Sequence, residues 1–434
     1  MRSIALPEAN LKPIQYTSSA IFAITLRQPA FRMSALPLTT GITNRVSSGD
    51  FRGLLLFRPR TARFFDGWED RMARRAFLFS TILFFVFGAA AFAQTRRKII
   101  LDQDARGPAT TDQQSMLLAL QSPNVETLGI TVVSGDMWRD EEVAHTLRML
   151  ELTGHAGVKV YSGAVFPLIN SKEEIARWSK LYGKVRYQGA WNEKRTVSKY
   201  EAPYHDPFVV PDLVEGNPTL KAEEEDAAHF IIRMLHKYPH EVTIYAGGPL
   251  TNLAQVLNLD PKAAALAQEL VIMGGSIAPE VEISWKTANR REFNFWWDPE
   301  AVHIVLRAPW KKITITTVDI SVKTRFTQDL IDRIAKAATP SAQYIAKYSD
   351  EEYLWDELAV AAWLDPSIIT KEVQLYMDID ISHTAGYGNT LVWMPGDQPG
   401  LGEQIVHVQT DLNLDKFHKM LIELLSRPST GPAM

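Results

Sequence analysis

Short runs of apolar residues alternate with amphipathic stretches along most of the chain after residue 97. The apolar runs are short and rich in β-branched side chains, and they lie at 98–101, 127–133, 158–161, 242–246, 270–273 and 313–318. Between them, 141–152 and 227–237 carry apolar residues three and four positions apart, the spacing of a helix with one buried face. Uniformly apolar strands separated by helices are typical of a parallel sheet covered on both faces. The pattern therefore predicts an α/β fold with a doubly wound, mostly parallel, Rossmann-like sheet.

Several predicted strands end in a carboxylate or in a pair of glycines. These residues are Asp102 and Asp104, Gly135-Asp136, Gly247-Gly248 and Gly274-Gly275. In a doubly wound sheet the carboxyl ends of the strands line one crevice, so we expect these residues to converge there. The stretch 171–214 is rich in Trp, Tyr and Lys and lacks clear strands. We interpret it as an insertion near the mouth of the crevice, within a single domain at 94–434.

Residues 72–93 have the three regions of a secretory signal peptide. Arg74 and Arg75 precede an apolar run at 77–92, and Ala91-Phe92-Ala93 supplies a small-x-small cleavage site. The run is shorter than the about 20 residues that a membrane span needs. We therefore expect cleavage near Gln94, a periplasmic or secreted protein and no stable membrane anchor. Residues 1–71 then represent an extension that results from a start codon chosen too early.

Composition narrows the chemistry further. The chain contains no cysteine, which excludes disulfides, thiolate metal sites and thiol catalysis. Residues 94–434 carry 34 basic against 45 acidic side chains. This excess of negative charge does not favour nucleic-acid binding, because neutralising the phosphates requires a basic surface.

The first strand and the following helix bring three carboxylates close in sequence. Asp102 and Asp104 end the strand, and Asp112 lies at the start of the helix. Carboxylate oxygens suit Ca²⁺ or Mg²⁺. Asp112 is equally compatible with a helix N-terminal carboxylate, and Asp102 with a solvated strand end. The residues by themselves leave both interpretations open.

Five segments, in order, resemble the calcium-dependent, inosine-uridine preferring nucleoside hydrolases. They are 98–136, GGPLTNL at 247–253, VIMGG at 271–275, EFN with DP at 292–299, and WDELAVA with DP at 355–366. The resemblance extends over about residues 98–425. It implies hydrolysis of the N-glycosidic bond of ribonucleosides to free base and ribose, and homodimers or homotetramers.

The resemblance also implies a bound Ca²⁺ held by four residues. Asp104, Asp112 and Asp356 match carboxylate ligands, and Gly247 matches a residue that binds through its backbone carbonyl. Asp104 matches in addition the residue that activates the attacking water. Asp102 matches the first aspartate of the opening motif.

On the sugar side, the resemblance implies contacts from several further residues. The family places two adjacent carboxylates where this chain has Thr111-Asp112, so we expect Thr111 to bond a sugar hydroxyl in place of the first carboxylate. The other matched positions are Asp136, Met273, Glu292, Asn294 and, at a different spacing, Asn289.

Trp355 directly precedes Asp356, where purine-preferring members of the family carry a tryptophan that stacks on the leaving base. This position predicts a purine-leaning nucleoside hydrolase, with core packing as the alternative role of Trp355. A second stacking aromatic is expected from 171–214, with Trp178 and Trp191 as candidates.

Two other functions remain open at the level of sequence. A phosphohydrolase using the Asp-x-Asp strand end would need a lysine and a phosphate-binding loop, and GGPLTN contains no lysine. A calcium-dependent sugar- or nucleoside-binding protein would account for Thr111 as a sign of lost catalysis.

Overall fold

Nine strands form one sheet in the part of the chain that the computed structural model describes, residues 96–194, 199–277 and 290–429. These residues belong to the second of two units, at 86–434. The strands are β1 Arg97–Gln103, β2 Val125–Val132, β3 Val160–Ser162, β4 Val242–Ala246, β5 Glu269–Met273, β6 Ile313–Thr316, β7 Ile369–Ile379, β8 Thr390–Trp393 and β9 Gln404–Leu412. The predicted signal peptide and the extension before it lie outside the described residues.

The helices follow the strands in the alternation that the sequence predicts. They are α2 Thr111–Gln121, α3 Arg139–Thr153, α4 Lys172–Tyr182, η1 Gly189–Trp191, α5 Ala227–Lys237, α6 Thr251–Leu259, α7 Ala263–Leu266, α9 Phe293–Trp297, α10 Pro299–Arg307, α11 Val318–Ser321, α12 Gln328–Ala335, α13 Pro340–Tyr348, α14 Trp355–Leu364, η2 Pro366–Ile368 and α15 Leu414–Leu425. None of these helices combines the length and hydrophobicity that a membrane span requires.

The strand order is β3-β2-β1-β4-β5-β6-β9-β7-β8. β1 pairs in parallel with both β2 and β4, and the chain proceeds outward from β1 first on one side and then on the other. Such a reversal of strand order opens a crevice at the carboxyl ends of the central strands. The expected convergence of strand-end residues therefore falls beyond β1 and β4.

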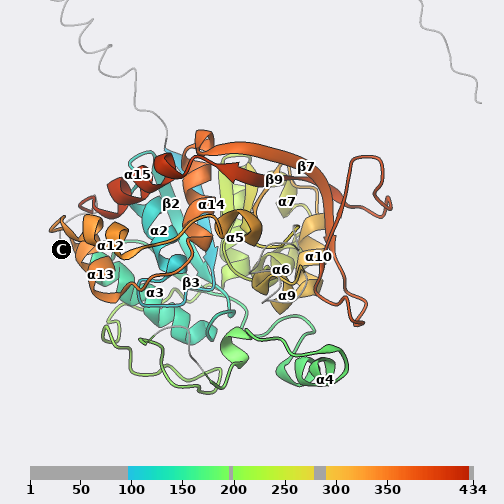
Figure 1. Cartoon of the computed structure of the whole chain (residues 1–434), viewed down its shortest axis with the longest axis horizontal. Coiled ribbons are helices and arrows are strands. Elements are labelled where there is room, and N and C mark those ends of the chain that lie inside the picture. The colour runs from blue at the N-terminus through green and yellow to red at the C-terminus, as the bar shows by residue number, and fades with distance from the viewer. Residues whose placement is uncertain (1–95, 195–198, 278–289, 430–434) are drawn as a thin grey trace, which may run out of the picture. The chain divides into compact units, whose positions relative to one another are not determined.

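Helices cover both faces of the sheet, as predicted (Figure 1). On one face, α2, α3 and α12 to α15 pack on apolar side chains of β1 and β2. On the other face, α5, α6, α7 and α10 pack on side chains of β4, β5 and β6. β4 is buried along its whole length, which explains its uniformly apolar sequence.

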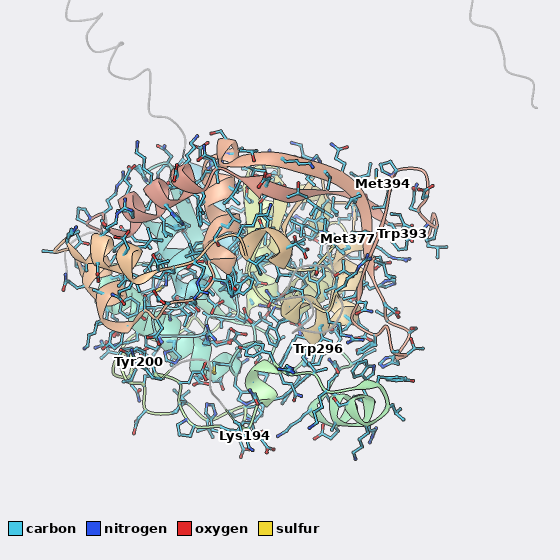
Figure 2. All side chains as sticks on the ribbon, in the orientation of Figure 1. Lys194, Tyr200, Trp296, Met377, Trp393 and Met394 are labelled. Atoms are coloured by element: carbon cyan, nitrogen blue, oxygen red, sulfur yellow. The ribbon has the colours of Figure 1, made fainter. Side chains whose placement is uncertain are left out.

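All six predicted strands are present as β1 to β6, whereas β7, β8 and β9 were not predicted. β9 pairs in parallel with β6, but β7 runs antiparallel to both β8 and β9. Trp393 of β8 and Met394 next to it lie at this outer edge of the sheet (Figure 2). The sheet is therefore mostly parallel with an antiparallel edge.

Candidate active site

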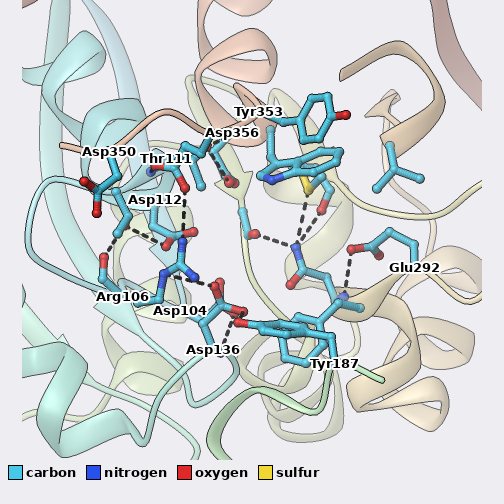
Figure 3. Close-up of a pocket in the computed structure, with 18 of the residues that line it drawn as sticks. Asp104, Arg106, Thr111, Asp112, Asp136, Tyr187, Glu292, Asp350, Tyr353 and Asp356 are labelled. Carbon is cyan, nitrogen blue, oxygen red and sulfur yellow. Dashed lines mark hydrogen bonds and ion pairs between the residues drawn. The ribbon is translucent and has the colours of Figure 1, made fainter. Parts of the chain in front are cut away.

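A cavity of about 480 Å³ opens at the carboxyl ends of β1, β4 and β5 (Figure 3). Ten of the residues predicted for the site line it, namely Asp104, Thr111, Asp112, Asp136, Gly247, Met273, Glu292, Asn294, Trp355 and Asp356. They come from segments far apart in the sequence, so the fold brings them together as the strand-end pattern predicts. Asn289 lies outside the described residues.

Asp104 follows β1 and is only 2 % exposed. Its Oδ2 accepts a hydrogen bond from the backbone N–H of Asp136 at 3.0 Å. A Cβ at Gly135 or Gly248 would lie 2.1 Å or 2.6 Å from atoms of Asp104, so both neighbouring loops need glycine to approach it. Burial, and then the negative charges of Asp136 and Asp112, raise the pKa of Asp104 well above its ordinary value. Its environment therefore favours the uptake of a proton.

Asp112 and Asp356 lie in the first turns of α2 and α14. Asp112 Oδ2 accepts a hydrogen bond from the Thr110 hydroxyl at 3.0 Å, and Asp356 Oδ1 accepts one from the Tyr245 hydroxyl at 2.8 Å. Burial, with the charge of Asp356 next in importance, raises the pKa of Asp112 well above its ordinary value. Burial also raises the pKa of Asp356 to about 6. These carboxylates are desolvated and repel one another, which a bound cation would relieve.

The donors around this cluster fit a calcium ion in their chemistry. Besides the three carboxylates, Gly247 offers a carbonyl oxygen, and Ca²⁺ takes oxygen ligands of both kinds. Asn294 Nδ2 donates to this carbonyl at 2.6 Å, which leaves the oxygen a second lone pair. Among the described residues, no group of three or more acidic or histidine side chains is arranged to hold a metal ion on its own.

Thr111 lines the cavity, but its hydroxyl group makes its bonds within the protein. Thr111 Oγ1 donates to Glu357 Oε2 at 2.6 Å and accepts from the backbone N–H of Asp356 at 3.1 Å. The backbone N–H of Thr111 donates to Glu352 Oε1 at 2.9 Å. Thr111 therefore joins the start of α2 to the start of α14.

Asn294 and Glu292 differ in what they can offer a ligand. Asn294 Nδ2 donates to the carbonyls of Gly247 and Met273, and within the described chain its Oδ1 accepts no hydrogen bond. Glu292 caps α9, and its carboxylate accepts from the backbone N–H groups of Gly275, Asn294 and Phe295 at 2.9–3.0 Å. Burial raises the pKa of Glu292 to about 7. Asn294 Oδ1 is thus the freer acceptor.

Aromatic rings contribute to two walls of the cavity. The half-buried Trp355 lies next to Tyr353, with their ring centroids 4.9 Å apart. Tyr187 and Phe293 lie edge to face at 4.8 Å on another wall, near Trp296. Trp355 is partly buried and lines the cavity, so its indole can contact a ligand there.

The second aromatic wall comes from 171–214, as expected, but from Tyr187 and not from either predicted tryptophan. Trp191 stacks on Trp297 at 4.0 Å, and Trp178 Nε1 donates to the Thr384 carbonyl at 2.8 Å. Both tryptophans belong to an aromatic cluster that packs this segment onto α9. They are thus part of a small core and do not line the cavity.

Several charged or polar cavity residues were not predicted, among them Arg106, Tyr187 and Glu352. The Tyr187 hydroxyl donates to Asp136 Oδ1 at 2.7 Å, and Arg106 Nη2 donates to Glu352 Oε2 at 3.2 Å. All three lie in loops, where no periodic pattern in the sequence indicates which side chains point into the cavity. The sequence offered one indication of these residues, namely an arginine in the loop between the matched Asp104 and Asp112.

Asp102 supports the site from behind. It is fully buried, and its Oδ1 accepts from the Thr131 hydroxyl at 2.5 Å and from Asn252 Nδ2 at 2.7 Å. Asn252 Oδ1 in turn accepts from the backbone N–H of Ala164 at 2.8 Å. Asp102 therefore ties β1 to β2 and α6, which explains the asparagine of the GGPLTN segment.

Comparison with known proteins agrees with this architecture. Residues 99–419 match the family model of the inosine-uridine preferring nucleoside hydrolases. The chain is 26% identical over 347 residues to an inosine-uridine preferring nucleoside hydrolase from Crithidia fasciculata, covering 76% of this chain and 98% of the relative. It is 26% identical over 312 residues to a pyrimidine-specific ribonucleoside hydrolase from Escherichia coli, covering 68% and 87%.

Among solved structures, a purine-preferring ribonucleoside hydrolase from Gardnerella vaginalis superposes with a TM-score of 0.61 at 23% identity, covering 76% of this chain and 98% of that one. This similarity establishes the shared fold. The family model spans the sheet and every described residue of the predicted site. The chain therefore belongs to the inosine-uridine preferring nucleoside hydrolase family, whose members hydrolyse the N-glycosidic bond of ribonucleosides.

Proposed function

We propose that this chain hydrolyses purine ribonucleosides to free base and ribose, with a calcium ion at Asp104, Asp112, Asp356 and the Gly247 carbonyl. The observation that carries the proposal is the convergence of the three buried carboxylates, Asn294 and Trp355 on one cavity. The carboxylates would bind the cation and position the water, Asn294 would bind the sugar, and Trp355 would stack on the base.

Asp104 is the general base of this proposal. The water oxygen forms a bond to C1′ of the sugar while Asp104 takes the water's proton, and the C1′–N bond breaks with its electron pair going to the base. The calcium ion, when bound, would lower the pKa of the water and fix it near the sugar. Because positive charge develops at C1′, the negative charge of the carboxylates also favours the transition state. Asn294 Oδ1 accepts a hydrogen bond from a sugar hydroxyl and so orients the ring.

Trp355 acts on the leaving base by stacking. An indole carries no transferable proton at neutral pH, but its face attracts a cationic ring. A purine can take up a proton on its imidazole nitrogen, whereas uracil has no ring nitrogen of comparable basicity. This difference supports the purine preference, which the relatives do not decide, since their names include both purine- and pyrimidine-directed enzymes.

The phosphohydrolase alternative fits the cavity less well than nucleoside hydrolysis does. No lysine lines the cavity in the described residues, whereas the phosphohydrolase reading requires one beside its Asp-x-Asp strand end. A calcium-dependent binding protein would use the same oxygen donors, and the release of free base from inosine distinguishes a hydrolase from it. We also propose export, with cleavage near Gln94, on the basis of the residues at 72–93.

A panel of inosine, guanosine, adenosine, uridine and cytidine tests the proposed base preference. We expect kcat/KM for the purine ribosides to exceed that for the pyrimidine ribosides by at least tenfold. Equal values, or a preference for uridine, would contradict the purine assignment. N-terminal sequencing of the secreted protein tests the export proposal, because a stable product that retains residues 1–71 would contradict it.

A further inference from the structure

Arg106 places a positive charge inside a cavity that is otherwise lined by carboxylates. Its side chain is 6 % exposed and lies beside Asp104, Asp112 and Asp136 (Figure 3). The residue belongs to the loop between Asp104 and Asp112, so the same loop that carries two proposed calcium ligands also carries this cation.

The loop holds Arg106 in place through several backbone contacts. The Arg106 N–H donates to the Asp104 carbonyl at 2.7 Å, and the Arg106 carbonyl shares the single Thr110 hydroxyl proton with Asp112 Oδ2. A Cβ on Gly107 would lie 2.6 Å from the His145 ring, so the loop lies directly against α3. The Ala109 N–H donates to Gln113 Oε1 at 2.8 Å. The loop backbone at Arg106 is therefore fixed by contacts within the protein.

The guanidinium is surrounded by carboxylates, yet it forms few hydrogen bonds. Nη2 donates to Glu352 at 3.2 Å, whereas Nε and Nη1 lie 3.6 Å from Asp136 and 3.7 Å from Glu201, too far for hydrogen bonds. Nε is buried without a hydrogen-bond partner in the described chain. A guanidinium has five N–H donors, so most of its donor capacity is unused.

The same cavity lacks one acceptor that the family resemblance implies. Thr111 replaces the first of two adjacent carboxylates, and its hydroxyl bonds Glu357 and the Asp356 backbone. A sugar hydroxyl can accept as well as donate a hydrogen bond. A donor from the neighbouring loop can therefore hold the hydroxyl that Thr111 does not.

We propose that the Arg106 guanidinium donates a hydrogen bond to a hydroxyl of the ribose 2′,3′-diol and so distinguishes ribosides from deoxyribosides. Arg106 at the same time balances the charge of Asp136, which the Tyr187 hydroxyl holds from the other side at 2.7 Å. This inference rests on the proposed nucleoside hydrolysis. Beyond that reaction, Arg106 is assigned as the residue that recognises a hydroxyl group of the sugar.

The test compares inosine, 2′-deoxyinosine and 3′-deoxyinosine as substrates of the wild type and of Arg106→Lys. Lysine keeps the positive charge but loses the planar fork of donors. We expect kcat/KM for inosine to fall about tenfold or more, and kcat/KM for one deoxynucleoside to change little, because a hydrogen bond from a charged group is lost only where the hydroxyl is present. The ratio of riboside to deoxyriboside hydrolysis should therefore collapse.

Arg291→Lys is the matched control. Arg291 also lines the cavity and is buried, but its guanidinium donates to the backbone carbonyls of Tyr387 and Ala385. Any loss in this variant should be equal for the three substrates. Melting temperatures of both variants report their folding. Arg106→Met, which keeps a long side chain but removes every N–H donor, serves as a second variant if the lysine destabilises the protein.

Failure of the inference can be told apart from failure of the proposed function. If the wild type releases no base from inosine, the proposed function is wrong. If the wild type is active but both folded Arg106 variants slow all three substrates equally, Arg106 balances charge only and the inference is wrong. The inference is also wrong if neither variant folds, because Arg106 is then a structural residue.

Discussion

The side-chain amide of Asn294 donates a hydrogen bond to the backbone carbonyl of Gly247 at 2.6 Å. One residue lies at the start of α9 and the other follows β4, and they belong to the proposed sugar site and the proposed metal site. The bond orients the amide so that its oxygen remains available to a ligand. It also fixes the direction of the carbonyl that we assign to calcium.

This contact predicts that Asn294→Ala affects both sites. We expect kcat/KM for inosine to fall about tenfold or more, because an oriented hydrogen bond to the substrate is lost. Calcium affinity should also decrease, since the Gly247 carbonyl loses the group that orients it. Titration calorimetry of the chelated protein with calcium measures the second effect. A variant with reduced activity but unchanged calcium affinity would show that the two sites are independent.

Asp104→Asn tests the general base. The amide has nearly the shape of the carboxylate and retains an acceptor for the Asp136 N–H, so the fold should persist. It cannot take a proton from water, and we expect kcat to fall by about 10²-fold or more. Circular dichroism and the melting temperature check the fold, and single-turnover assays measure the chemical step. Activity close to that of the wild type would assign the base to another residue.

Trp355→Ala separates stacking from packing. If the indole stabilises a protonated purine, the variant should lose much of its activity on inosine and guanosine. It should lose far less on p-nitrophenyl riboside, whose leaving group needs no proton. Both substrates are assayed side by side on the same preparation. Equal losses on the two would indicate that Trp355 only packs next to Tyr353 at the start of α14.

Asp298 predicts a pH dependence of stability that is independent of the reaction. It is fully buried at the start of α10, where it accepts from the Thr251 hydroxyl at 2.7 Å and from the Leu168 and Ala301 N–H groups. Burial raises its pKa from 3.8 to about 6. The folded state therefore binds this proton more tightly than the unfolded state does, and the resulting stability is lost as the pH rises from about 4 to 6.

Asp298→Asn lacks this titration. The difference in free energy of unfolding between wild type and variant should therefore shrink from pH 4 to pH 7, by at most about 3 kcal/mol. Urea unfolding of both proteins at several pH values measures it. A difference that is constant over this range would mean that Asp298 has an ordinary pKa.

The sequence predicts the centre of this fold better than its edge. β1 to β6 are buried parallel strands, and short, mostly apolar runs between helices are the pattern that such strands produce. These strands can therefore be predicted from local sequence. β7 has exposed residues along most of its first half, and its pattern mixes polar and apolar positions. Antiparallel edge strands of this kind depend on their partners, here β8 and β9, which no local signal identifies.

The residues of the site also differ in how well the sequence predicts them. Asp104, Asp112, Gly247 and Asp356 lie at strand ends or helix starts, so the fold class itself brings them together. Arg106 and Glu352 meet from loops 246 positions apart, and their pairing depends on loop conformation. Tyr187 was missed because the tryptophans of its segment are larger aromatic candidates, yet they are used in the packing of that segment. Local sequence identifies the residue types of such loops, but not the direction of each side chain.

The most direct test of the account is to incubate the purified wild type with inosine and to measure hypoxanthine and free ribose together, first after chelation and then after calcium is restored. We predict that both products form in equal amounts, without added phosphate, only when calcium is present. The Asp104→Asn variant should stay inactive under all of these conditions. Turnover that is unaffected by chelation would contradict the calcium assignment, and the absence of both products with calcium present would contradict the proposed hydrolysis itself.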